Sequence, residues 1–130
     1  MTEAQTALSR RLVACKGWRW MPGMATVQGE RVVLMGDDGT LRLAAPWGGT
    51  DVTAVRSFVD SSGACLPDLT DPATLGCLLA LVRAAWGMSG LSLTPWSDGW
   101  EYAWRGHDKG PCGYWFTEAE ALVAALEGAP

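Results

Sequence analysis

The chain has 130 residues, 48% of them hydrophobic, and a formal net charge of −4 at pH 7. This length and composition predict a single globular domain over residues 1–130 and exclude a disordered acidic chain. They also argue against a dedicated binder of nucleic acid, because such proteins need many cations to displace the counterions of the phosphates. The first 31 residues carry five basic and two acidic side chains, whereas the remainder carries five basic and twelve acidic ones. This asymmetry is compatible with an oriented contact, although solvated helix and strand faces are the simpler interpretation.

The cysteines and the hydropathy of the chain bear on its compartment. The four cysteines, Cys15, Cys65, Cys77 and Cys112, form no C-x-x-C pair, and the first residues lack the apolar region of a secretory signal. We therefore expect a cytoplasmic protein with reduced, mostly buried thiols. The longest apolar stretch, residues 73–86, is too short to span a bilayer, so we expect no membrane partner.

The first predicted element is a helix over residues 3–16. Thr2 and Gln5 have the spacing of a capping box at its start, and one face of the segment is apolar. Gly17 is placed to end the helix in the left-handed conformation.

The stretch "KGWRWMPGM" follows, and Pro22 favours an extended chain before it. In an extended chain Trp18 and Trp20 point to one side and Arg19 to the other. Two interpretations remain open: at least one indole fills the core, with Arg19 in water, or the pair forms a patch that contacts a partner.

Two strands and a third, ambiguous segment come next. Residues 31–35 and 40–44 bracket "GDDGT", which predicts a hairpin with Gly39 in a positive-φ position and Leu41 and Leu43 toward the core. "PWGG", at residues 46–49, predicts a turn. Residues 52–59 suit either a helix or a strand, and we predict a strand because threonine and valine are frequent in it.

The clearest pattern in the chain is a central helix. Asp71 is a natural N-cap, Pro72 suits the first helical position and Gly87 ends the segment. Large apolar residues form one stripe along it: Leu75, Leu78, Leu79, Val82 and Trp86. Small residues form a second stripe: Ala73, Cys77, Ala80 and Ala84. A helix that is apolar all round is expected to be buried on both sides, with the small stripe against another helix of the chain or a second subunit in a homodimer.

The last third of the chain repeats the mixture of strands and helix. We expect a strand over residues 91–95 and a turn at "WSDG". After the turn we expect a second strand that carries Trp100, Tyr102 and Trp104 on one face. Thr117 and Glu120 have capping-box spacing before a final helix that ends at Gly128. The order of elements predicts an α+β fold in which an antiparallel sheet is packed by a buried central helix and by N- and C-terminal helices.

Patterns that indicate catalysis are absent from the sequence. His107 and Cys112 could form a nucleophile and base, but no oxyanion site or orienting group accompanies them. The cysteines lack the paired spacing of a zinc site, so we expect no metal or other cofactor. There is no phosphate-binding glycine motif, and acidic residues occupy the starts of the second and third helices.

Eight tryptophans are unusual for a chain of this length. They cannot all fit within so small a core, so some are expected to be partly exposed, where tryptophan frequently contacts a partner or stacks on a ring. The alternative is that they cap the edges of the core with the indole N–H in water. The candidate partner-binding residues are Trp18, Arg19, Trp20, Trp47, Trp96 and Arg105.

Three stretches together carry a resemblance: "GWRWMPGM", "LPDLTDPATLGCLLALVRAAWG" and "TEAEALVAALEGAP". They resemble small proteins of tailed bacteriophages and prophages of high-GC bacteria. The resemblance implies a phage accessory protein that acts in the cytoplasm of the bacterial host, and it implies no activity and no site residue.

These observations predict a non-enzymatic protein that binds a bacterial cytosolic protein, such as an anti-CRISPR-like or other counter-defence inhibitor. One alternative is a protein that sequesters a nucleotide or other small molecule in a pocket of tryptophans and cations such as Arg19 or Arg105. Another is a small hydrolase that uses His107 and Cys112.

Overall fold

The computed structural model describes residues 2–35, 40–44, 52–57, 66–104 and 110–130. In chain order its elements are α1 (Glu3–Val13), β1 (Arg31–Met35), β2 (Thr40–Ala44), β3 (Val52–Ser57), α2 (Pro72–Trp86), β4 (Ser92–Trp96), β5 (Gly99–Ala103), β6 (Tyr114–Trp115) and α3 (Glu118–Glu127). This mixture of helices and antiparallel sheets confirms the predicted α+β class. No helix within these described ranges is long and apolar enough to cross a membrane.

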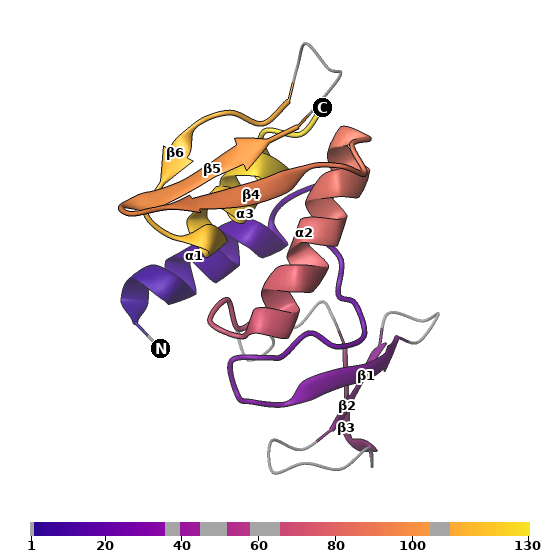
Figure 1. The fold of residues 1–130 in the computed structure, drawn as a ribbon. Coiled ribbons are helices and arrows are strands. Elements are labelled where there is room, and N and C mark those ends of the chain that lie inside the picture. Colours follow the sequence, from indigo (N-terminus) through magenta and orange to yellow (C-terminus); the bar gives the residue numbers. More distant parts are fainter. Residues whose placement is uncertain (1, 36–39, 45–51, 58–65, 105–109) are drawn as a thin grey trace.

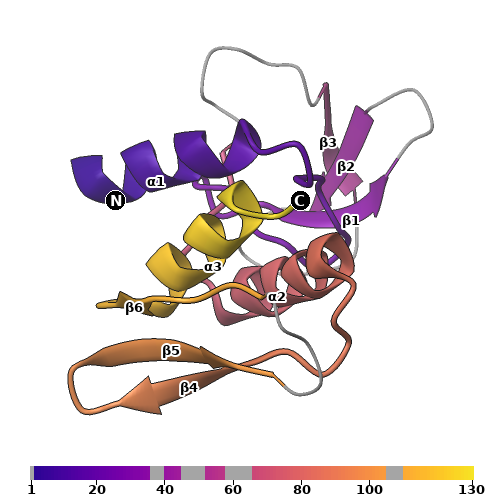
Figure 2. The same cartoon turned by 90° about the horizontal axis from the view of Figure 1, so that it is seen from above.

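The strands form two sheets, where the sequence predicted one. Each sheet is antiparallel and three-stranded, with the orders β1-β2-β3 and β4-β5-β6. The helices lie between the two sheets in both ribbon views (Figures 1 and 2). The chain passes from the first sheet to the second through α2, which follows β3 and precedes β4.

The helix α1 begins as predicted and ends earlier. Its capping box is present, since the Gln5 amide donates to the Thr2 hydroxyl at 3.1 Å and the Thr2 amide donates to the Gln5 side chain at 2.9 Å. The helix ends at Val13 and does not reach Lys16. Gly17 does not adopt the left-handed conformation that we predicted. It is instead a point of close approach, because a Cβ there would lie 3.0 Å from the Leu126 side chain.

The stretch after α1 places its two indoles in the core, as the first interpretation predicted. Trp20 is only 4% exposed, and Trp18 is half-buried against the same cluster. Their rings pack edge to face with centroids 5.4 Å apart. Arg19 points to solvent between them. The Trp20 side chain is therefore a component of the core.

The first sheet confirms the predicted hairpin and the third strand. β1 pairs with β2 from Arg31↔Ala44 to Met35↔Leu41, and β2 pairs with β3, so the ambiguous segment is a strand. Leu43 is fully buried, as expected. The turn with Gly39, the "PWGG" turn and the side chain of Leu41 lie outside what the structure describes.

The helix α2 has the predicted ends and an unexpected environment. Asp71 caps it, Pro72 occupies its first turn, and Gly87 ends it with φ +66°. The large stripe faces the core, with Leu78 and Val82 fully buried. The small stripe does not face the core. Its residues Ala73, Ala80 and Ala84 are exposed, and Cys77 is half-buried. The prediction that α2 is buried on both sides is therefore wrong for the single chain.

The most enclosed helix is α3, which contacts α1, α2, β5 and β6 (Figure 2). Its N-cap is Thr117, whose hydroxyl accepts from the Glu120 amide at 3.1 Å, and it ends at Gly128 as predicted. Two aromatic side chains reach its backbone: Tyr102 donates to the carbonyl of Ala121, and Trp86 donates to that of Ala125, each at 2.8 Å. Because alanine has only a methyl group, rings can approach the backbone at these points and satisfy their polar atoms inside the core.

Candidate functional site

The best candidate for a functional site is the face of the β4–β6 sheet that points away from the helices. The register pairs Thr94 with Glu101 and Glu101 with Tyr114, and it pairs Trp96 with Gly99. Side chains of paired residues point to the same side of a sheet and alternate along each strand. We call the set of Ser92, Thr94, Trp96, Gly99, Glu101, Ala103 and Tyr114 the outer face.

Aromatic side chains are concentrated on and beside the outer face. Trp96 is 58% exposed, Tyr114 is 47% exposed, and Phe116, directly after β6, is 83% exposed. They are three of the four large hydrophobic side chains that are exposed among those whose burial the structure describes, the fourth being Val33 on β1. Tryptophan and tyrosine in particular are enriched at the energetic centres of protein interfaces.

The Tyr114 ring is held in place by two contacts. Its hydroxyl donates a hydrogen bond to the Asp98 carboxylate in the β4–β5 turn, and this bond raises the pKa of Tyr114 to about 12. The ring also lies over Gly99, where an added Cβ would be 2.5 Å from both the ring and the backbone oxygen of Trp115. Tyr114 therefore remains a protonated, pre-positioned phenol at physiological pH.

The inner side of the same sheet makes the outer face rigid. Tyr102 is 5% exposed, packs edge to face on Trp115 at 5.7 Å and is hydrogen-bonded to α3. Burial raises the pKa of Tyr102, so it keeps the proton that it donates. Trp100 and Trp104 are half-buried on the same side, as the alternating pattern predicted. These rings anchor the inner side of the sheet to the core.

The surroundings of the outer face are acidic. Asp98 and Glu101 lie on the β4–β5 hairpin itself. The hairpin, residues 92–103, contains these two acidic side chains and no lysine or arginine. A partner surface that complements this region would be apolar at its centre and basic around it.

The six predicted contact residues are not brought together. Trp18 and Trp20 belong to the core cluster, with Arg19 exposed beside them, whereas Trp96 stands on the outer face. Trp47 and Arg105 lie outside the described ranges. Sequence reasoning missed Tyr114 and Phe116, although the signal existed: if Trp115 points inward, its two neighbours point outward.

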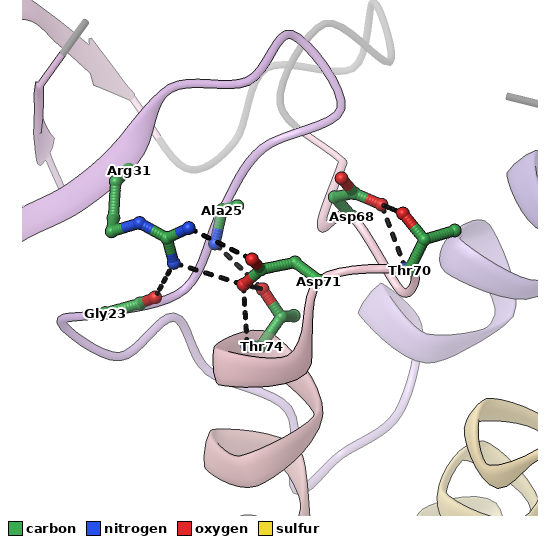
Figure 3. A network of polar contacts seen from close by, with 7 residues as sticks. All are labelled: Gly23, Ala25, Arg31, Asp68, Thr70, Asp71 and Thr74. Atoms are coloured by element: carbon green, nitrogen blue, oxygen red, sulfur yellow. Dashed lines mark hydrogen bonds and ion pairs between the residues drawn. The ribbon is translucent and has the colours of Figure 1, made fainter. Parts of the chain in front are cut away.

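A second polar cluster joins the loop after α1 and the strand β1 to the start of α2 (Figure 3). The Arg31 guanidinium donates to both carboxylate oxygens of Asp71, at 3.0 and 3.1 Å, and to the Gly23 carbonyl at 2.5 Å. Asp71 also accepts from the amide and hydroxyl of Thr74, whose hydroxyl accepts from the Ala25 amide at 2.9 Å. The Arg31 hydrogen bond lowers the pKa of Asp71 to about 2. Because these polar groups are satisfied within the chain, the cluster ties the loop after α1 and the strand β1 to the start of α2.

The described residues bring together no metal-binding cluster. No group of three or more histidine, cysteine or acidic side chains gathers in a way that could hold a metal ion. Burial raises the pKa of Cys15 and Cys77, so both are protonated thiols at neutral pH. Cys112 is exposed, contrary to the expectation of mostly buried thiols, and its proposed base His107 lies outside the described ranges.

Comparisons of the chain with protein-family models, with curated proteins and with solved structures gave no significant match. The resemblance to phage proteins therefore stays a prediction from the sequence.

Proposed function

We propose that the chain is a non-catalytic binding protein whose contact surface is the outer face of the β4–β6 sheet. The observation that carries the proposal is the exposure of Trp96, Tyr114 and Phe116 on a sheet whose other side is packed against α3. Large rigid aromatic side chains bury much area on association and lose little conformational entropy. In keeping with the sequence resemblance, we place this protein in a phage-infected bacterium, where it acts on a host cytosolic protein as a counter-defence factor.

The chemistry of the face specifies the kind of partner. Asp98 and Glu101 favour basic side chains around an apolar centre. The contact is expected through the face and not through strand addition at the β4 edge, because Pro95 lacks the N–H that a new strand would pair with. The partner is therefore a folded protein with an apolar, positively charged patch.

A capture experiment tests the proposal. Immobilised protein is incubated with bacterial lysate, and the retained polypeptides are compared among wild type, Trp96→Ala, Phe116→Ala and the matched control Val33→Ala, an exposed apolar residue of the other sheet. We expect a basic polypeptide that is lost with the first two variants and kept with the control, and that is released by added salt. Retention that is equal in all four proteins, or release of a metabolite alone, would contradict the proposal.

Self-association through α2 is a second proposal, and the exposure of its small stripe favours it. Ala73, Ala80 and Ala84 are uncovered in the single chain, and small side chains allow two helices to approach closely. This surface lies on a different element from the outer face, so a homodimer is compatible with binding of a partner.

A further inference from the structure

A groove runs beside the α1–α3 contact and is separate from the outer face. It has a volume of about 860 Å³, which is within the range of sites for small organic molecules. Its lining residues come from α1, from the β6–α3 junction with the first turns of α3, from the loop before α2 and from the start of α2. Figure 2 shows α1 and α3 side by side along this region.

The interior of the groove is apolar and partly aromatic. Leu8, Leu75, Trp115 and Ala119 line it, and all four are half-buried against the core. Leu69 completes the lining from the loop. An apolar molecular body can therefore be covered on several sides, and a cation near the Trp115 ring would also gain from its quadrupole.

The side chains that line the groove leave it with a net negative charge, because its basic residue is already in an ion pair. Arg11 is the basic lining residue, and its guanidinium is bound to the Glu127 carboxylate at 2.6 and 3.2 Å. Glu118 and Glu120 also line the groove, and neither carboxylate forms an ion pair with any described residue. The field in the groove therefore favours positive charge and disfavours nucleotides and other anions.

We propose that this groove binds a small organic cation: an amine or guanidine carried on an apolar, ring-sized body. The apolar body lies against Leu8 and Leu75, and the positive group lies near Glu118 and Glu120. The proposal is independent of the contact surface assigned above, because none of the groove residues belongs to the outer face.

Three probes with the same phenyl body and different charge test this proposal: phenethylamine, 2-phenylethanol and 3-phenylpropionate. Each is titrated into the ¹⁵N-labelled protein, and amide shifts give the affinity and the location. We expect shifts in α1 and the start of α3, with the amine binding at least roughly tenfold more tightly than the alcohol and the acid binding most weakly.

Two double variants separate the groove from general charge effects. In Glu118→Gln/Glu120→Gln the amine is expected to lose its advantage while the alcohol binds as before, which shows that the groove is still formed. Glu3→Gln/Glu101→Gln removes the same charge outside the groove and is expected to leave all three affinities unchanged. The proposal is overturned if no probe binds, if the three probes bind equally, if the shifts lie elsewhere, or if both double variants weaken the amine alike.

Discussion

Arg19 and Trp20 are neighbours in the chain and have opposite environments. Trp20 is 4% exposed and packs on Trp18, whereas Arg19 is exposed. The sequence predicted this arrangement because an extended chain alternates its side chains and Pro22 favours an extended backbone. The sequence analysis did not assign Tyr114 and Phe116 to a contact surface. Their side chains point outward because Trp115 between them points inward, where its ring packs on Tyr102 of another strand.

Substitution of these two neighbours should have unequal effects on stability. Trp20→Ala leaves a cavity in the core and is expected to cost about 3–5 kcal/mol of a total of about 5–15 kcal/mol. The thermal midpoint should fall by roughly 10–20 °C. Arg19→Ala should leave it almost unchanged, and differential scanning calorimetry measures both. A Trp20→Ala melt that overlays the wild-type curve would show that Trp20 is not a core residue.

Removal of the Asp71 charge should change how stability depends on pH. The pKa of Asp71 is lowered from 3.8 to about 2 by the Arg31 hydrogen bond, so its carboxylate stabilises the fold fully above about pH 4. This contribution is lost as the pH falls from about 4 toward 2. Asp71→Asn keeps an N-cap acceptor, and we expect it to cost about 1 kcal/mol at pH 7, since solvent screens the half-exposed Arg31.

Urea unfolding of Asp71→Asn and wild type at several pH values between 2 and 7 checks this expectation. The variant should show a flatter acid limb than wild type, while Glu3→Gln, which removes an exposed charge on α1, should keep the wild-type slope. Parallel acid limbs for Asp71→Asn and wild type would mean that Arg31 and Asp71 are not paired in solution.

At the scale of elements, the helix starts could be predicted and the helix environments could not. Thr2, Asp71 and Thr117 act as N-caps because capping depends on residues within one turn. The end of α1 was misjudged, since Gly17 packs closely against Leu126 of a distant helix and does not adopt the left-handed backbone that ends a helix. Likewise the apolar pattern of α2 indicated burial all round, whereas α3 is the enclosed helix, because periodicity shows which faces are apolar and not what covers them.

The uncovered stripe of α2 gives a prediction about assembly. If it meets a second copy, Ala80→Leu should overpack a close helix contact and weaken the dimer. Sedimentation velocity over a range of concentrations should then show wild type as a dimer and the variant as a lighter species. A wild-type protein that sediments as a monomer at every concentration would remove α2 as a subunit interface.

At the scale of the whole molecule, the sequence predicted the α+β class and not the division into two sheets. Local alternation identifies the strands and the β4–β5 hairpin, but the packing of this sheet on α3 depends on contacts between separate elements. That division creates the candidate site. The inner rings of the β4–β6 sheet pack on α3, and on the opposite face Trp96 and Tyr114 stay exposed among the residues that the structure describes.

The affinity of the outer face for its captured partner is the most direct test of the proposed function. Loss of one hot-spot aromatic residue typically costs 2 kcal/mol or more, which is about a 30-fold weaker Kd. Isothermal titration of the purified pair should therefore show Trp96→Ala/Phe116→Ala binding at least about 100-fold more weakly than wild type, at an unchanged thermal midpoint, with Val33→Ala equal to wild type. A double variant that binds the partner as tightly as wild type would contradict the assignment of this face as the contact surface.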